Sequence, residues 1–204
     1  MILVTGANSQ IANCLKEIPI NKIIFLTRQQ CDISKKNEII AIIKKYNINL
    51  IINTAAYTNV IQAEKDKEQA YLANNCEILA KICQSYDIKL LHLSTDYVFN
   101  GKQQRRYLES DITQPLNFYG LSKLAAEIVI QKYCQKYIIL RISGVYSCYN
   151  KNFVKTIIHL LTKKKQISVI NDQYCCPTSA IDIANTINIL IKIMSVSYTH
   201  LRAH

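Results

Sequence analysis

Tyr119 and Lys123 are the two residues whose types and spacing best support chemistry in this sequence. On a helix, positions i and i+4 share a face, so the phenol and the ammonium would lie together. A nearby cation lowers a phenol pKa from its usual value of about 10. Tyr119 would then donate a proton to a carbonyl group that is being reduced. The alternative for any such pair is a simple contact on a surface helix.

A hydroxyl and a carboxylate precede this pair in the segment Ser94-Thr95-Asp96-Tyr97. The apolar run Leu90–Leu93 ends directly before them, and ligands of open parallel sheets bind outside the carboxyl ends of the strands. Thr95 therefore offers a second hydrogen bond to the same carbonyl oxygen. Lys123 is also long enough to hold a nicotinamide ribose.

The first turn of the chain has the character of a nucleotide-binding loop. The apolar run Ile2–Val4 leads into Thr5-Gly6-Ala7-Asn8-Ser9-Gln10-Ile11-Ala12. Backbone N–H groups at such a strand-to-helix turn bind a pyrophosphate. Only Gly6 keeps the glycine of the three-glycine pattern, because Ser9 and Ala12 occupy the other two positions. An ordinary turn is the alternative interpretation.

The end of the second apolar run predicts which nucleotide would bind. An acidic residue there would bind a ribose 2′-hydroxyl, whereas Arg28 favours the 2′-phosphate of NADP. Asp32 and Ile33 follow at the expected adenine side. A solvated surface arginine is the alternative for Arg28.

Six short apolar runs, most of them rich in β-branched residues, predict strands that are buried on both faces, as in a parallel sheet. The runs are Ile2–Val4, Ile23–Leu26, Leu50–Ile52, Leu90–Leu93, Ile138–Ile142 and Ile167–Ile170. Helical periods separate them, so the chain predicts an α/β fold, a Rossmann-like doubly wound parallel sheet with helices on both faces.

Three of the intervening helices have a predicted buried stripe. A helix from Ala70 to Tyr86 would bury Ile78, Leu79, Ile82 and Cys83, and a helix from Tyr119 to Tyr133 would bury Leu121, Leu124, Ala125, Ile128 and Val129. A third helix is expected over Ile181–Met194. The last ten residues, 195–204, have neither period, and we expect them to be a non-native tail.

Composition excludes several classes of protein. Lysine and arginine number 25 against 14 acidic residues, a net charge of +11, but the lysines are scattered and Ile and Asn are enriched with them. We therefore expect no nucleic-acid partner. The eight cysteines form no C-x-x-C, which predicts free thiols in a reducing cytoplasm and no metal site. No leader peptide and no membrane-spanning run is apparent.

The motifs together resemble the extended short-chain dehydrogenase/reductases, and within them the dTDP-4-dehydrorhamnose reductase family. The matching segments run in order along nearly the whole chain to about residue 194. They are Thr5-Gly6-Ala7-Asn8-x-Gln10, Asn53-Thr-Ala-Ala-Tyr-Thr58 with Ala63-Glu64, Leu93-Ser-Thr-Asp-Tyr-Val-Phe-Asn-Gly101, Pro115-Leu-Asn-x-Tyr-Gly-x-Ser-Lys123, Arg141-Ile-Ser-x-Val-Tyr146, and Asp172-Gln173 with Pro177-Thr178. The sequence departs from the family at Ser9, Ala12, Gly144 and Cys175.

The resemblance implies reduction of the C4 ketone of dTDP-4-dehydro-L-rhamnose by NADPH, with NADH as the alternative, to give dTDP-L-rhamnose. It makes Tyr119, Lys123 and Thr95 catalytic and gives Thr95, Asp96 and Tyr97 to the substrate. The implied cofactor contacts are Gly6, Asn8, Ser9, Gln10, Ile11, Ala12, Arg28, Asp32, Ile33, Ala55, Ala56, Tyr57, Tyr119 and Lys123.

The resemblance also implies how the chain is divided. Residues 1–146 would form the NAD(P)-binding domain and residues 147–194 a partial substrate-binding region interleaved with it. A dTDP-sugar is the expected partner, and a homodimer is left open. A non-catalytic, NADP-binding regulatory subunit on the same scaffold is the alternative function, since fold alone does not decide activity.

Overall fold

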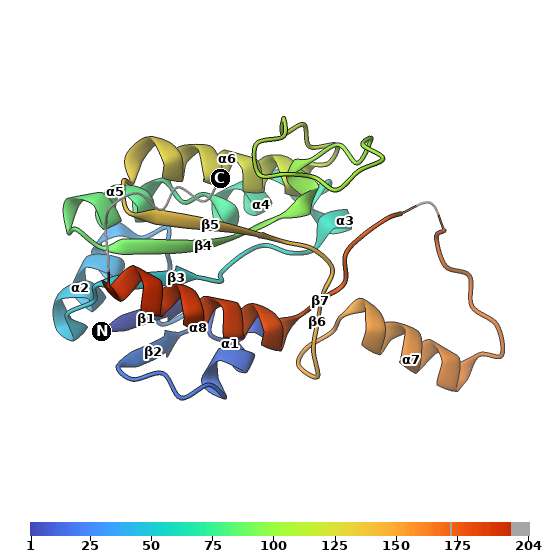
Figure 1. The fold of residues 1–204 in the computed structure, drawn as a ribbon, viewed down its shortest axis with the longest axis horizontal. Helices are drawn as coiled ribbons and strands as arrows, with labels where there is room; N and C mark the ends of the chain where they lie inside the picture. The colour runs from blue at the N-terminus through green and yellow to red at the C-terminus, as the bar shows by residue number, and fades with distance from the viewer. Residues whose placement is uncertain (172, 197–204) are drawn as a thin grey trace.

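A five-stranded parallel sheet forms the centre of the protein, in a computed structural model that describes residues 1–171 and 173–196 (Figure 1). The strands are ordered β2-β1-β3-β4-β5. Their bounds are β1 Ile2–Thr5, β2 Ile23–Leu26, β3 Leu50–Asn53, β4 Lys89–Thr95 and β5 Tyr137–Ile142. The order reverses at β1, with β2 on one side and β3 on the other, which is where such sheets bind their ligands. The predicted fold class is confirmed.

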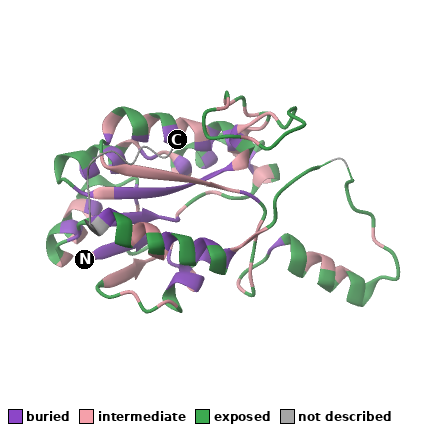
Figure 2. Ribbon diagram, viewed as in Figure 1, coloured by how far each residue is buried: buried purple, intermediate pink, exposed green. Residues whose placement is uncertain are grey.

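Helices cover both faces of this sheet. Because successive side chains of each strand point to opposite faces, every strand contributes buried residues to both layers. One face buries Leu3, Ile51 and Leu90 against helices α2 (Lys36–Tyr46), α5 (Glu77–Ser85) and α6 (Phe118–Tyr133). The other face buries Val4, Ile52 and Leu91 against α1 (Gln10–Lys16) and α8 (Ala180–Val196). Figure 2 shows the buried residues concentrated between these layers.

The carboxyl ends of the strands carry short connecting elements. Helices α3 (Val60–Ala63) and α4 (Lys67–Asn74) follow β3, and a 3-10 turn, η1 (Asp96–Val98), follows β4. Beyond β5, the two-residue strands β6 (Val145–Tyr146) and β7 (Thr178–Ser179) pair with each other. Helix α7 (Phe153–Lys163) extends away from the sheet between them (Figure 1).

The sixth predicted strand is wrong. Residues 167–170 have no regular structure and belong to the long connection from α7 to β7. Val169 and Ile170 are more than half exposed, so the apolar run packs on no other strand. A β-branched run forms a strand only where a sheet edge is within reach, and this segment lies away from the sheet (Figure 1).

The predicted helix from Ala70 to Tyr86 is interrupted. Asn75 adopts an extended conformation after α4, and its side-chain oxygen accepts from the backbone N–H of Glu77, which begins α5. Leu79, Ile82 and Cys83 are buried as predicted, whereas Ile78 is exposed. The break separates a helix beside the strand ends from a helix that covers the sheet.

The predicted buried stripe of α6 is also wrong. Leu121 and Ile128 are about half exposed, at 51% and 53%, and the opposite face is buried. That face carries Gly120, Ser122, Lys123, Ala126, Glu127 and Ile130. Its polar groups each find a partner inside the protein, and Ala126 and Ile130 on the same face join the core, so hydrogen bonding acts together with hydrophobic packing.

The C-terminal segment divides between the body and the periphery. Helix α8 contributes Ala180, Ile183, Ala184 and Ile187 to the core beneath β1. The expected tail 195–204 begins within α8, and residues 197–204 lie outside the described residues. In the described part of the chain, no helix combines the length and the apolar character needed to cross a bilayer.

Candidate functional site

A cleft of about 310 Å³ opens at the carboxyl ends of β1 and β3, at the point where the strand order reverses. It is lined by the first turn, the end of β2, the segment after β3 and the start of α4's last turn. The lining residues are Gly6, Ala7, Asn8, Ser9, Thr27, Arg28, Cys31, Asp32, Ile33, Thr54, Ala55, Ala56, Thr58, Leu72 and Ala73. Eight of these are predicted cofactor contacts: Gly6, Asn8, Ser9, Arg28, Asp32, Ile33, Ala55 and Ala56.

Gly6 brings the first turn against the segment that follows β3. Its φ of +70° is in the left-handed region, which a side chain disfavours. A Cβ at this position would lie 2.7 Å from the backbone nitrogen of Ala55, which is closer than atoms can approach. The backbone of the turn can therefore form one wall of the cleft only because residue 6 is glycine.

Ser9 and Ala12, which occupy two positions of the three-glycine pattern, have structural roles. The Ser9 hydroxyl accepts a hydrogen bond of 3.0 Å from the backbone N–H of Ala12 and so caps α1. It also lies 2.8 Å from the Thr54 hydroxyl. Ala12 is fully buried in the core beneath β1. A methyl group fits between helix and strand at this position, and the turn remains intact.

Six of the predicted cofactor contacts lie outside the lining of this cleft: Gln10, Ile11, Ala12, Tyr57 and the Tyr119–Lys123 pair of α6. Ile11 is buried in the core with Ala12, and Gln10 accepts hydrogen bonds from Ser147 and Asn152. The Tyr57 hydroxyl donates to Asp66 at 3.4 Å. Gln10 therefore joins the nucleotide turn to the segment between β6 and α7.

A second, more open hollow of about 510 Å³ adjoins the first beside Arg28. Asn8, Thr27, Gln29, Asp32 and Lys35 also line it. Arg28 contacts Asp32 at 3.3 Å, and its side chain is 71% exposed. Two cationic side chains, Arg28 and Lys35, therefore line this hollow together with one carboxylate, Asp32.

The Thr95 and Tyr119 hydroxyls lie together at the end of β4. Burial raises the pKa of Tyr119 to about 12, and the hydrogen bond with Thr95 opposes that rise. The ring of Tyr97 packs edge-on against Tyr119 with 5.8 Å between ring centres. The carboxylate of Asp96 accepts from Thr95 at 3.2 Å and from Ser143. The predicted substrate residues therefore surround the predicted proton donor.

Lys123 is fully buried and points toward the sheet. Its Nζ donates to the carbonyl oxygen of Leu93 at 2.7 Å and lies 3.1 Å from Nε2 of His92. Burial lowers the pKa of Lys123 to about 8. The predicted pair thus shares one face of α6, but the recorded polar contacts of Lys123 are with β4 rather than with Tyr119.

Sequence reasoning missed an ion pair that holds this region together. Glu127 is 1% exposed and accepts two hydrogen bonds from Arg141, at 3.0 and 2.6 Å, as well as one from Ser94. The pair joins α6 to β5 and β4. Because the three residues are far apart in the sequence, no local pattern predicts their contact.

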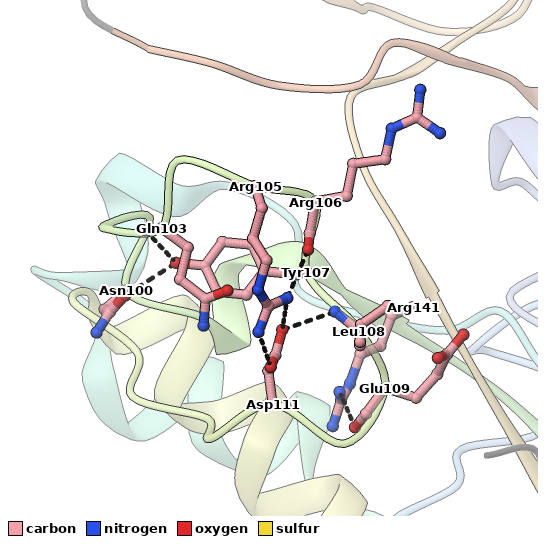
Figure 3. Close-up of polar contacts among 9 residues, drawn as sticks. All are labelled: Asn100, Gln103, Arg105, Arg106, Tyr107, Leu108, Glu109, Asp111 and Arg141. Carbon is pink, nitrogen blue, oxygen red and sulfur yellow. Dashed lines mark hydrogen bonds and ion pairs between the residues drawn. The ribbon is translucent and has the colours of Figure 1, made fainter.

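Arg141 extends this network to the loop after β4. Its guanidinium lies 5.0 Å from the ring centre of Phe99. It also donates to the backbone oxygen of Glu109 (Figure 3). The same loop is closed by Arg105 and Asp111, which form two hydrogen bonds of 2.9 and 2.7 Å. Arg106 points away from this cluster (Figure 3).

The fold and the candidate site define a doubly wound α/β protein with a cleft where the strand order reverses and a helix that carries Tyr-x-x-x-Lys. The family model described as RmlD substrate binding domain matches residues 1–202. The chain belongs to this family.

Curated relatives and solved structures agree with this assignment. The chain is 36% identical over 192 residues to a dTDP-4-dehydrorhamnose reductase of Aggregatibacter actinomycetemcomitans, covering 91% of this chain and 65% of the relative. It is 40% identical over 151 residues to that of Escherichia coli, covering 73% and 50%. A crystal structure of the Bacillus anthracis reductase in complex with NADP superposes with a TM-score of 0.90 at 36% identity, covering 95% of this chain and 70% of that one.

These figures also show how much of a relative the chain represents. It spans 65% of the length of the A. actinomycetemcomitans relative and half that of the E. coli relative.

Proposed function

We propose that the protein reduces the C4 ketone of dTDP-4-dehydro-L-rhamnose to dTDP-L-rhamnose with NADPH. The observation that carries the proposal is the pairing of Thr95 with Tyr119 at the end of β4, in a fold that also opens a cleft at the reversal of strand order. The printed names of the relatives, and the NADP in the B. anthracis structure, support the substrate and the cofactor.

The residues around the cleft fit a phosphorylated dinucleotide. Gly6 lets the first turn lie directly against the backbone of Ala55, where a Cβ would collide. The N–H groups of this turn, at the start of α1, would bind a pyrophosphate. Asp32 and Ile33 would flank the adenine, and Arg28 would bind a 2′-phosphate, which favours NADPH over NADH. Ala55 and Ala56 would lie along the cofactor. When bound, NADPH supplies a hydride.

The chain's own residues would supply the proton. Tyr119 donates its phenolic proton to the carbonyl oxygen of the substrate, and Thr95 hydrogen-bonds the same oxygen. Asp96, held by Ser143, and the Tyr97 ring orient the sugar. Lys123, as an ammonium, stabilises the tyrosinate that remains. Raising the Tyr119 pKa to about 12 makes this help necessary, because a buried phenol loses its proton reluctantly.

The remaining assignments follow from this proposal. Residues 1–146 would form the NAD(P)-binding domain, and residues 147–194 a partial substrate-binding region that is interleaved with it through α8. The partner is a dTDP-sugar, and the compartment is the cytoplasm, where the eight cysteines, all free in this structure, would stay reduced. A homodimer stays a prediction.

The test compares the protein with Tyr119→Phe. NADPH fluorescence should report equal binding by both, and oxidation of NADPH with dTDP-4-dehydro-6-deoxysugar should fall by a factor of about 10²–10⁴ in the variant. Tyr133→Phe, at the far end of the same helix, is the matched control and should leave both readings unchanged.

Equal oxidation by Tyr119→Phe and the parent would refute the role of Tyr119. Tight NADPH binding without any oxidation in the parent would instead favour the regulatory subunit.

A further inference from the structure

A row of buried polar side chains crosses the sheet beneath the candidate site. Thr5, Asn53 and His92 are register neighbours on β1, β3 and β4, and each is at most 1% exposed. They continue the apolar row Leu3, Ile51 and Leu90 on the face that α5 and α6 cover. Polar groups this deep must have a specific arrangement of donors and acceptors. The row ends at Lys123.

The amide of Asn53 has only one orientation that satisfies its neighbours. Its Oδ1 accepts from the backbone N–H of Ala55 at 3.3 Å and from the Thr5 hydroxyl at 2.7 Å. A backbone N–H cannot accept, so Oδ1 must face Ala55. The Nδ2 group then donates to Nδ1 of His92 at 3.1 Å and to Sγ of Cys76 at 3.4 Å.

This orientation fixes the tautomer of His92. Because Nδ1 accepts from Asn53, the proton of a neutral imidazole must lie on Nε2. Burial holds the pKa of His92 well below its usual range, so the ring is neutral. Nε2 therefore presents an N–H to Nζ of Lys123, 3.1 Å away.

An ammonium cannot accept this hydrogen bond, whereas a neutral amine can. As an amine, Lys123 accepts from His92 through its lone pair and donates to the carbonyl oxygen of Leu93. The other titratable groups that act on Nζ are Cys76, before α5, and Glu127, one turn along α6. Both favour the ammonium, but Glu127 is already bound to Arg141. Burial outweighs them and lowers the pKa of Lys123 to about 8.

We propose that His92, oriented by Asn53, is a positioning residue that holds Lys123 as a neutral amine on the sheet side and releases it toward Tyr119 when Nζ takes up a proton. The protonated Nζ faces the Nε2–H of His92 as a second donor, so the contact becomes repulsive. The proton comes from water, and no bond other than N–H is made or broken. The direction of release rests on the proposed function, which pairs Lys123 with Tyr119.

The tautomer can be measured on the free chain by the ¹⁵N shifts of its imidazole rings, with His92 assigned by comparison with His92→Gln. We expect Nε2 protonated and Nδ1 unprotonated near neutral pH. A proton on Nδ1, or a charged ring, would overturn the proposal. No cofactor is present, so a failure to bind NADPH would refute the proposed function and leave this result standing.

The isosteric variant Asn53→Asp tests the coupling to Lys123. A carboxylate only accepts hydrogen bonds, so the proton of the His92 ring moves to Nδ1 and is donated to the new carboxylate. Nε2 then becomes an acceptor for the ammonium of Lys123. We expect the titration of Lys123, followed by its ¹³Cε shift and assigned with Lys123→Met, to move upward by about one pH unit or more.

The added charge alone would also raise this pKa, so a double variant with His92→Phe is the control. The Lys123 pKa shift caused by Asn53→Asp is compared in proteins with His92 and with His92→Phe. If the two shifts are equally large, the imidazole does not transmit the effect and the proposal fails. A shift that is mostly lost supports it. The ¹⁵N measurement on the unaltered chain decides the tautomer even if the variants do not fold.

Discussion

Single residues at this site act through their hydrogen-bond partners. Tyrosine is a common proton donor, but the pKa of Tyr119 depends on its burial and on its hydrogen bond with Thr95, which lies 24 positions earlier in the sequence. Lys123 shows the same dependence more strongly, since its contacts with His92 and Leu93 decide where its amine lies. Chemistry at the residue scale is therefore set by burial and neighbours together.

The stability of the fold should depend on pH through Lys123. Its pKa is about 8 in the folded protein against 10.5 ordinarily. Below pH 8 Lys123 is protonated in both the folded and the unfolded chain. The free energy of unfolding is then reduced by the full cost of burying its ammonium group. Between pH 8 and 10.5 the folded chain releases its proton first, so that cost declines as the pH rises.

Lys123→Met should therefore gain up to about 3 kcal/mol in relative free energy of unfolding at pH 7, and the gain should shrink by pH 10. Urea unfolding at the two pH values measures the difference between variant and parent. A difference that does not change with pH would contradict the lowered pKa of Lys123.

Arg28 should control the choice between the two nicotinamide cofactors. Arg28→Gln removes the guanidinium beside the open hollow, and a charge-assisted hydrogen bond to a phosphate is worth about 1.5–3 kcal/mol. We expect the Kd for NADPH to rise roughly ten- to a hundredfold and that for NADH to stay constant. Lys44→Gln, an exposed charge on α2, should alter neither value, and an equal loss for both cofactors would exclude a 2′-phosphate contact.

Secondary-structure elements are fixed relative to one another by buried polar contacts as well as by the core. Glu127 and Arg141 join α6 to β5, and the same arginine reaches the loop that Figure 3 shows. This ion pair and the buried Lys123 thus set the rotation of α6 about its own axis, and α6 carries Tyr119 and Lys123. An apolar stripe alone would have turned it the other way.

Arg141→Met should destabilise the protein by about 3–5 kcal/mol, because Glu127 would remain buried without a cation. The double variant Arg141→Met with Glu127→Gln should recover part of this loss. Arg105→Met breaks the more exposed pair with Asp111 and should cost only about 1 kcal/mol. Chemical denaturation of the four proteins tests this order; comparable losses for Arg141→Met and Arg105→Met would contradict it.

At the scale of the whole molecule, helix α8 completes the packing of one face of the sheet. Helix α8 follows α7 in the chain, yet it returns to cover the sheet beside α1 (Figure 1). Helix α7 keeps Phe153, Ile158 and Leu161 more than half exposed. The elements around the sheet are thus tightly packed, whereas α7 leaves large apolar side chains exposed.

Ile187→Ala should lower the free energy of unfolding by about 2–5 kcal/mol, because it leaves a cavity beneath the sheet at a fully buried position. Ile189→Ala, on the exposed side of the same helix, makes an identical chemical change and should cost less than about 1 kcal/mol. Thermal or urea unfolding gives both values. Similar losses from the two would mean that α8 does not pack on the body as described.

The sequence by itself determined the elements and the candidate residues. Five β-branched runs predicted the five strands of the sheet, and the Gly6 turn and the Tyr119–Lys123 spacing predicted the positions of the site, because each pattern is local. Only the tertiary structure decided which face of α6 is buried, that residues 167–170 form no strand, and that Asn53 and His92 reach Lys123. Those outcomes depend on hydrogen-bond partners and sheet edges contributed by distant segments, and hydrophobic periodicity contains no information about them.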